Sequence, residues 1–428
     1  RTNEYINEEW ISDKVRFNYD GYYQQRIDTP YIKENQKLSI SNWEESLKVL
    51  KDKLKTLKPL ALIGEHVDLE TGYAIKKFMS NYGKDNVECR TDNHAILESL
   101  DSYRFNTPLN DIENSDLIIL LGTNPKIETP IINHKIFKAY NNDAKVFNIG
   151  ENISLNYKTE YLGESLSNLN NENLIKALKK STNPLIIIGS AFLNKIKNIK
   201  TLKSIFSYAD KYKVITKEKN NLNFLNPYAS RVGQLIIGNT TNNLCEPFSN
   251  LKKDNFELVL SFGSEHIANE QFNNCFKVYF GHHGDDGAMG SDIVLPTPLY
   301  TEKNGTFVNI EGRPQEAKKC HNPIGSAKEE WSILKKLSDE LSFDFTPNTF
   351  DQLRSELFDK YPILSDYHEI IAVENSTSIT PDIEFEDCKA EYPVSNFYMS
   401  DVISKNSVTM AKCVEEIIST PSLLEKSA

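Results

Sequence analysis

Two histidines and two aspartates stand together in one short, glycine-flanked stretch of the chain. The run Gly281-His282-His283-Gly284 leads directly into Asp285-Asp286. Imidazole nitrogens and carboxylate oxygens are metal ligands, so these residue types admit a metal site. Adjacent side chains, however, point in different directions and rarely bind one ion. The pattern therefore favours a polar loop, and we expect no metal ligand here.

Charged residues follow this loop within a predicted hairpin. Asn304-Gly305 is a strong turn signal between residues 300–303 and 306–309, so we expect a hairpin over 300–309. Glu302, Glu311 and Arg313 can form a buried ionic cluster that fixes this hairpin, or can contact a ligand. The sequence favours the structural role.

Two further loops have the form of anion-binding turns. Gly122-Thr123-Asn124-Pro125 and Gly263-Ser264-Glu265-His266 each follow an apolar run. Ligands of open α/β sheets bind beyond the carboxyl ends of strands, where loop amides and helix N-termini attract anions. For a single loop, an ordinary tight turn is the better interpretation. Because two such loops occur in two matching halves, an ancestral nucleotide-type cleft remains an equal alternative. The candidate residues of such a cleft are Gly122, Asn124, Gly263 and Arg313.

Other chemical signatures are absent from the sequence. There is no Walker loop, no G-x-G-x-x-G after a strand, no G-x-S-x-G and no H-E-x-x-H. None of the 6 cysteines forms a C-x-x-C, so a self-contained zinc or iron–sulfur centre is not expected. We expect reduced thiols in a core and no catalytic residue.

Length and charge narrow the class of protein. The 428 residues suffice for about two or three domains. Lys and Arg number 49 against 60 Asp and Glu, a net charge of −11 that argues against a nucleic-acid-wrapping surface. No apolar run approaches the ~20 residues of a membrane span. The chain starts at Arg1 with no visible signal peptide, and we expect it to be processed or part of a longer product.

Short apolar runs that end at or beside a glycine recur along the chain. Runs of this length are typical of strands buried on both faces of a parallel sheet. They lie at residues 60–64, 117–122, 146–150, 185–189, 258–263 and 277–281.

Helical stripes separate these runs. Apolar residues at helical spacing extend over 43–57, 75–82 and 331–341, with capping boxes at Ser41-x-x-Glu44 and Ser326-x-x-Glu329. Alternating strands and helices predict an α/β protein with two Rossmann-like, doubly wound halves and mainly parallel sheets. We expect a lead-in segment at 1–40, the halves at 41–160 and 161–345, and a helix with an extended acidic tail at 346–428.

Several stretches together resemble the C-terminal region of the 75-kDa iron–sulfur subunit of respiratory complex I, the NADH:ubiquinone oxidoreductase. The resemblance is carried by residues 6–21, by Leu121–Pro125, by Gly281–Asp285 through Glu311–Arg313, and near the end by Asn396–Asp401 and Thr409–Val414. It runs nearly end to end and is weakest around 190–250. It implies the molybdopterin-oxidoreductase fold.

The same resemblance implies a place and a set of partners. The place is the peripheral arm of complex I, on the matrix side of the mitochondrial inner membrane. In this family the iron–sulfur clusters are held by an N-terminal region, which is not in this chain and which we expect on a partner polypeptide or on the rest of a longer one. The implied partners are this cluster-bearing part and other peripheral-arm subunits.

Two departures from true molybdopterin enzymes bear on chemistry. Where those enzymes supply a cluster cysteine in a Cys-x-Lys-Gly-Arg-Phe-like segment, this chain has Ser12, and serine is a poor iron ligand. In the loop of the molybdenum ligand only Cys89 is available, and it stands at the end of a strand. We therefore expect no molybdenum, no pterin and no other cofactor in this chain, and a structural, non-catalytic role. An active molybdopterin oxidoreductase and a nucleotide- or anion-binding module remain the alternatives.

Overall fold

The computed structural model describes residues 3–4, 6–83, 86–241, 256–371, 383–385, 387–392 and 396–418. The chain forms two compact units, each made from separated stretches. Unit 1 comprises Arg1–Gln24, His94–Pro227 and Val373–Ala428, and unit 2 comprises Gln25–Asn93 and Tyr228–Ala372. The units therefore do not follow the boundaries expected at residues 160 and 345. The reason is strand pairing. Pro59 in the stretch 25–93 pairs with Leu258 in the stretch 228–372, so the two stretches share one sheet.

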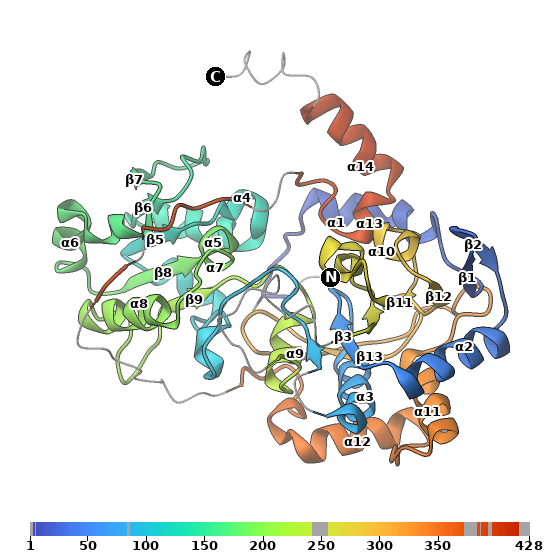
Figure 1. Cartoon of the computed structure of the whole chain (residues 1–428). Helices are drawn as coiled ribbons and strands as arrows, with labels where there is room; N and C mark the ends of the chain where they lie inside the picture. The colour runs from blue at the N-terminus through green and yellow to red at the C-terminus, as the bar shows by residue number, and fades with distance from the viewer. Residues whose placement is uncertain are drawn as a thin grey trace. The chain divides into compact units, whose positions relative to one another are not determined.

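Unit 1 is built on a five-stranded sheet with the order β7-β6-β5-β8-β9 (Figure 1). Every neighbouring pair in this sheet is parallel. All residues of the two central strands, β5 and β8, are buried, as expected where both faces of a parallel sheet are covered. The strands are β5 (Leu117–Leu121), β6 (Lys145–Ile149), β7 (Glu160–Gly163), β8 (Pro184–Ile188) and β9 (Leu222–Phe224).

Helices of unit 1 connect these strands and also lie at residues 13–23 and 402–418. The connecting helices are α4 (Pro125–Glu128), α5 (Pro130–Asn141), α6 (Glu172–Leu178), α7 (Ser190–Leu193) and α8 (Ile199–Lys211). The terminal ones are α1 (Asp13–Phe17), the 3-10 helix η1 (Asn18–Tyr23), α13 (Val402–Lys405), α14 (Val408–Cys413) and a π-helical turn at Val414–Ile418. The tail expected to be extended thus contains short helices within its described residues 402–418.

Unit 2 is built on a seven-stranded sheet with the order β2-β1-β12-β11-β10-β3-β4. The five strands from β12 to β4 are parallel, whereas β1 is antiparallel to β12 and β2 is antiparallel to β1. The strands are β1 (Tyr31–Glu34), β2 (Lys37–Ile40), β3 (Pro59–Ile63), β4 (Val87–Glu88), β10 (Leu258–Phe262), β11 (Phe276–Gly281) and β12 (Ile293–Pro296). All of the six predicted strand runs are strands in one unit or the other.

The helices of unit 2 confirm the predicted stripes but shift their caps. They are α2 (Trp43–Thr56), α3 (Leu69–Met79), α9 (Arg231–Ile236), α10 (Asp286–Met289), α11 (Glu330–Leu341) and α12 (Phe350–Lys360). The cap of α2 is Asn42, whose side chain accepts a hydrogen bond from the Glu45 amide, rather than Ser41. Glu329 precedes α11 without a side-chain cap, so the predicted box at Ser326 does not form.

Short 3-10 segments link these elements. They are η2 (Ser80–Tyr82), η3 (Leu100–Ser102), η4 (Leu109–Asn114), η5 (Leu166–Asn170), η8 (Glu265–Ala268), η9 (Glu270–Phe272) and η10 (Pro362–Leu364).

The hairpin predicted over 300–309 is displaced along the chain. β13 (Gly305–Val308) pairs antiparallel with β14 (Pro314–Ala317), so the turn lies at 309–313 rather than at Asn304-Gly305. Asn309 makes this turn, because its side-chain oxygen accepts hydrogen bonds from the amides of Glu311 and Arg313 at 3.0 and 2.9 Å. Gly312 supplies the positive φ of 83° that the turn needs.

Each sheet reverses its winding direction at one point. In unit 1 the chain runs outward from β5 through β6 to β7 in one direction, and from β8 to β9 in the other. In unit 2 it runs from β3 to β4 in one direction, and from β10 through β11 to β12 in the other. The carboxyl ends of these strand pairs are the switch points at which ligands of doubly wound sheets bind. The two predicted glycine loops follow β5 and β10, so both lie at a switch point.

Candidate functional site

The switch point of unit 1 is closely packed backbone. Gly122 follows β5 with a φ of +60°, and a Cβ placed on it would lie 2.3 Å from the ring of Phe192. A Cβ on Gly189, which follows β8, would lie 2.4 Å from the carbonyl oxygen of Gly122. Glycine is therefore required at both positions by close approach, which leaves no space at these atoms for a ligand.

A carboxylate of the chain itself uses the donors of this loop. Glu128 accepts hydrogen bonds from the hydroxyls of Thr123 and Ser190 and from the backbone amides of Asn124 and Ser190. Burial raises the pKa of Glu128. The hydrogen bonds lower this pKa but do not cancel the effect of burial, so it stays above its ordinary value. Amides and hydroxyls at helix starts are the groups that bind phosphate. At this switch point they already hold the carboxyl group of Glu128, which occupies the place of such a ligand.

The C-terminal segment Asp387–Tyr392 crosses the carboxyl end of the same sheet. The Ala390 amide donates to Glu164 after β7 at 3.1 Å, and the Glu391 amide donates to Ala191 after β8 at 3.4 Å. The Tyr392 amide donates to the side chain of Glu151, after β6, at 3.3 Å. Burial raises the pKa of the Tyr392 hydroxyl, with a further contribution from Glu128. The chain's own tail therefore covers the edge at which a ligand would enter.

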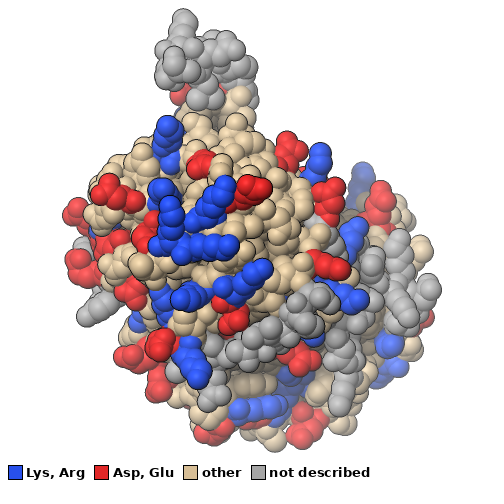
Figure 2. Space-filling model, turned by 90° about the vertical axis from the view of Figure 1, so that its left-hand side faces the viewer, with Lys and Arg blue, Asp and Glu red and all other residues tan. Residues whose placement is uncertain are grey.

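The same tail runs along a lysine-rich surface of unit 1. Phe385 packs against Tyr208 of α8 with ring centroids 5.7 Å apart, and the Glu384 amide donates to Ser204 at 3.2 Å. Figure 2 views the side on which α6 and α8 lie in Figure 1 and shows Lys and Arg side chains gathered there. Exposed lysines from α6 to the stretch after α8 are Lys176, Lys179, Lys180, Lys197, Lys200, Lys211, Lys213 and Lys217. The described part of the acidic tail thus lies on the chain's own surface.

At the switch point of unit 2, the loops after β3 and β10 approach each other closely. Gly263 follows β10 with a φ of +67°, beside Gly64 after β3, whose Cβ would lie 2.1 Å from the Gly263 carbonyl oxygen. Burial raises the pKa of Tyr228 well above its usual value, and Glu65 and Glu265 raise it further. Asp92 also raises this pKa, whereas the buried Arg231 lowers it, so charges of both signs lie near the Tyr228 hydroxyl.

The polar loop after β11 has structural partners. Asp285 caps α10 by accepting from the Ala288 amide at 2.8 Å, and it also accepts from the Tyr279 hydroxyl at 2.6 Å. Nδ1 of His282 lies 2.6 Å from Nδ1 of His283, and burial lowers the pKa of His282 well below its ordinary value. Within the described residues, no group of three or more His, Cys, Asp or Glu side chains has the arrangement of a metal site.

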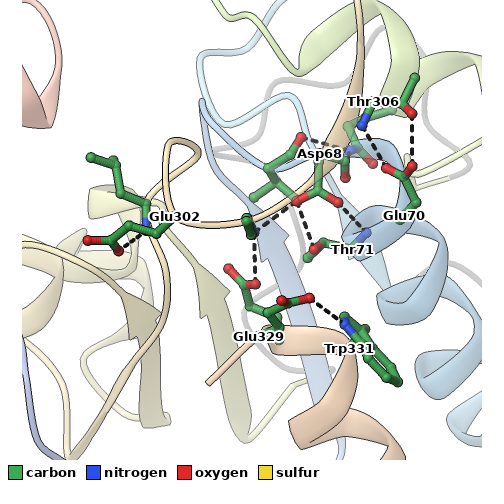
Figure 3. A network of polar contacts seen from close by, with 12 residues as sticks. Asp68, Glu70, Thr71, Glu302, Thr306, Glu329 and Trp331 are labelled. Atoms are coloured by element: carbon green, nitrogen blue, oxygen red, sulfur yellow. Dashed lines mark hydrogen bonds and ion pairs between the residues drawn. The ribbon is translucent and has the colours of Figure 1, made fainter. Parts of the chain in front are cut away.

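A buried ionic network joins the β13 hairpin to three helices of unit 2 (Figure 3). Lys303 lies 2.8 Å from both Asp68 and Glu330. Burial alone lowers the pKa of Lys303, but the two carboxylates raise it above its ordinary value. Glu70 accepts from the amide and hydroxyl of Thr306, both at 2.8 Å. Arg354 of α12 also donates to Glu70, at 2.7 Å.

The expected ionic cluster of Glu302, Glu311 and Arg313 is divided between different partners. Glu302 pairs with Arg26 at 2.7 Å, while Glu311 lies 3.6 Å from Arg313. The fixing role belongs instead to Lys303, Asp68 and Glu70, which sequence reasoning did not select. Their signal in the sequence is weak, because charged residues in polar stretches are usually solvated.

The four candidate cleft residues are distributed over both units. Gly122 and Asn124 belong to unit 1, and Gly263 and Arg313 belong to unit 2. The side-chain oxygen of Asn124 is buried without a hydrogen-bond partner. Arg313 lies in the hairpin turn and donates to the carbonyl of His368. At the switch point of unit 1, Glu128 is the residue that sequence reasoning missed.

Cys89 and Ser12, the two positions at which the family's metal ligands were considered, have other surroundings. Cys89 directly follows β4, and burial raises the pKa of its thiol to about 12. Ser12 caps α1 by accepting from the Val15 amide at 3.3 Å. The switch point of unit 1, where Glu128 takes the donors, and Ser12, which offers no thiolate, do not fit a phosphate-bearing metal cofactor.

Comparison with protein families gives three matches along the chain. The model for molybdopterin oxidoreductase matches residues 26–340. The model for the C-terminal part of the G subunit of NADH-ubiquinone oxidoreductase matches residues 372–413. The model for the NDSU1/NuoG-like 4Fe-4S domain matches residues 1–20, a stretch that contains no cysteine.

Curated relatives align over almost the whole chain. The G subunit of the NADH-quinone oxidoreductase of Rickettsia bellii is 37% identical over 97% of this chain and 61% of the relative. The NADH-ubiquinone oxidoreductase 75 kDa subunit of Reclinomonas americana is 34% identical over 96% of this chain and 64% of the relative. The mitochondrial NADH-ubiquinone oxidoreductase 78 kDa subunit of Candida albicans is 32% identical over 97% of this chain and 60% of the relative. The chain thus spans about three-fifths of the length of these relatives.

Solved structures share the fold at low identity. Acetylene hydratase from Pelobacter acetylenicus has a TM-score of 0.61 at 11% identity, covering 87% of this chain and 70% of that one. The formyltransferase/hydrolase complex of Methylorubrum extorquens has a TM-score of 0.55 at 12% identity, covering 73% and 99%. No described helix is long and apolar enough to span a bilayer. The chain therefore belongs to the molybdopterin oxidoreductase family, and its homologues are the G and 75 kDa subunits of NADH:quinone oxidoreductases.

Proposed function

We propose that this chain is a structural, non-catalytic part of the peripheral arm of respiratory complex I. It supports electron transfer from NADH to ubiquinone along iron–sulfur clusters carried by a partner region. The relatives are named as subunits of NADH-quinone or NADH-ubiquinone oxidoreductases, and the one from Rickettsia bellii aligns with 97% of the chain. The proposed location is the matrix side of the mitochondrial inner membrane, since the Candida albicans relative is named as a mitochondrial subunit of NADH-ubiquinone oxidoreductase.

The observation that carries the non-catalytic part of the proposal is Glu128. Its carboxyl group accepts hydrogen bonds from Thr123, Asn124 and Ser190 at the switch point of unit 1, the position at which ligands of doubly wound sheets bind. The tail Asp387–Tyr392 lies over the same edge. A rigid support is useful without redox groups of its own, because clusters on a partner must keep fixed positions.

Purification of the native assembly tests this proposal. The tagged chain is isolated from detergent-solubilised mitochondria, and the preparation is analysed for NADH oxidation, iron, molybdenum and pterin fluorescence. We expect the chain to migrate with NADH-oxidising activity and iron on a native gel, while the same chain produced alone contains neither molybdenum nor pterin and does not oxidise NADH. Stoichiometric molybdenum or pterin in the isolated chain would instead establish a cofactor enzyme. A chain outside any such assembly would overturn the proposal.

A further inference from the structure

One side of unit 1 carries a strong excess of positive charge. Residues 176–219 contain 11 lysines against two acidic residues, Asp210 and Glu218, whereas the whole chain has more acidic than basic residues. An exposed lysine is ordinary by itself, because charged side chains are usually solvated. The near absence of acidic neighbours is different, since like charges held close together repel one another and attract anions. This side of the unit is therefore a candidate surface for an anionic partner.

The lysines gather on one face because the segments that carry them pack together. The Tyr208 hydroxyl of α8 donates to the Leu169 carbonyl, in the segment that leads into α6, at 2.8 Å. Beyond the two helices, the ammonium group of Lys219 donates to the side chain of Asn183. Figure 2 shows the Lys and Arg side chains of this side gathered in one area. We call the lysine face the set of exposed lysines Lys176, Lys179, Lys180, Lys197, Lys200, Lys211, Lys213 and Lys217.

The chain's own tail shows how this side of unit 1 holds an acidic segment. The Glu384 amide donates to the Ser204 hydroxyl of α8 at 3.2 Å. Further along the tail, Asp387 accepts from the Ser165 hydroxyl at 2.7 Å, and Glu391 pairs with Lys195. A peptide segment without helix, rich in carboxylates, is therefore seated beside the lysines and is held through both its backbone and its side chains.

Most of the lysine face has no anionic partner among the described residues. Lys176 is its only member that forms an ion pair there, with Glu172 at 3.4 Å, and both of these side chains are largely exposed. We propose that the lysine face binds an extended acidic segment of a partner protein, next to the chain's own tail. The surplus of lysines attracts carboxylates, and the seated tail shows that a peptide fits along this side of unit 1.

Two other anionic partners match the surface less well. A membrane-binding face combines lysines with large apolar side chains that enter the bilayer. Within the described part of 172–219, Ile199 is the only large apolar residue that is exposed, at 40%. A long nucleic acid extends beyond the lysine face, and the net charge of −11 on the chain repels it. A peptide of limited length meets neither obstacle. Its binding is independent of the proposed function, so the full chain by itself is sufficient for the test.

Two triple variants test where a fluorescein-labelled oligoglutamate peptide binds, with fluorescence anisotropy as the measure of its binding to the full chain. Both reverse the charge of three exposed lysines, one on the lysine face and the other in unit 2. The first carries Lys180→Glu, Lys200→Glu and Lys217→Glu, and the second carries Lys37→Glu, Lys55→Glu and Lys319→Glu. We expect the first to weaken binding by about tenfold or more and the second by less than about twofold, since exposed charges act within about 10 Å at ~0.1 M salt. Thermal unfolding shows whether each variant folds as the parent does. Gln at the same three positions of the lysine face removes charge without adding repulsion, and we expect it to give a smaller loss of binding.

Carbodiimide coupling, which joins a carboxylate to a lysine in contact with it, locates the bound peptide. We expect products with lysines of the lysine face. Coupling only to lysines elsewhere, equal losses in the two triple Glu variants, or no binding to the parent would overturn the inference. Two rival probes are measured with the same variants, namely vesicles of phosphatidylcholine and phosphatidylglycerol in equal parts, and a single-stranded RNA. If the lysine-face variant weakens the binding of a rival probe but not of the peptide, the partner is a membrane or a nucleic acid and the inference is wrong.

Discussion

The ammonium group of Lys303 lies 2.8 Å from the carboxylate of Asp68 in the interior of unit 2. Asp68 also caps α3 by accepting from the Thr71 amide at 2.8 Å, and Lys303 reaches Glu330 at the start of α11. One lysine therefore ties the hairpin segment to two helices. Because all three side chains are buried, none can exchange its partner for water.

Replacing Lys303 tests this arrangement. Lys303→Met leaves Asp68 and Glu330 as buried carboxylates without their counterion, and removal of one partner of a buried pair typically costs about 3–5 kcal/mol. We expect a loss of that size in the urea-induced unfolding of unit 2. The control is Lys51→Met, which removes an exposed pair with Glu340 and is expected to cause no measurable change. Equal effects for the two substitutions would contradict the structural role of Lys303.

Two glycines with similar backbone angles form a matched pair. Gly122 and Gly263 have φ values of +60° and +67°, so alanine is strained at both positions, by about 1 kcal/mol. At Gly122 the added Cβ also meets the Phe192 ring at 2.3 Å, whereas at Gly263 nothing lies within 4 Å. We expect Gly122→Ala to lower the melting temperature clearly more than Gly263→Ala. The reverse order would show that the loop after β5 is not packed as described.

The buried carboxylate of Glu128 predicts a pH dependence of stability. Its folded-state pKa is raised by burial, so the folded state binds more protons than the unfolded state above the ordinary value of 4.5. This group therefore makes the folded chain less stable as pH rises from about 4.5 through the raised pKa. We expect the difference in melting temperature between Glu128→Gln and the parent to change across that window and to be constant below it. A constant difference at every pH would refute the assignment.

Cysteine reactivity separates the buried from the exposed thiols. Burial raises the pKa of Cys89 to about 12, whereas Cys320 is exposed. Since the thiolate is the nucleophile, we expect iodoacetamide at pH 8 to alkylate Cys320 readily and Cys89 only after unfolding. Peptide mapping by mass spectrometry gives both rates in one sample. Rapid alkylation of native Cys89 would contradict the burial of its thiol.

The N-terminal anchor responds to acid. Lys135 and Lys138 hold the pKa of Glu8 at about 2, below its ordinary value, so the contribution of Glu8 is complete above pH 4.5 and is lost as pH falls toward 2. We expect Glu8→Gln to increase hydrogen exchange of residues 6–17 at pH 7. The difference from the parent should shrink as pH is lowered through that window. Exchange that is unaffected at pH 7 would show that Glu8 does not anchor the segment.

Local sequence predicted the elements well but not their caps or turns. The apolar runs at 117–122 and 258–263 became β5 and β10, because a continuous run of buried-strand residues has few alternatives. The turn signal at Asn304-Gly305 failed, since Asn309 and Gly312 offer a second turn and the packing of Gly305 against Asp68 selects it. A Cβ on Gly305 would lie 2.6 Å from that of Asp68.

The sequence by itself determined the α/β class, the six predicted strands and the family resemblance, because these depend on local periodicity and on contiguous motifs. Tertiary structure alone decided which strands share a sheet, and hence the division into units that the sequential boundaries missed. It also decided that Glu128 takes the donors of the Gly122 loop and that Lys303 lies between Asp68 and Glu330. Such contacts join residues that are far apart in the chain or unremarkable in type, and only burial in the folded state makes their charges matter.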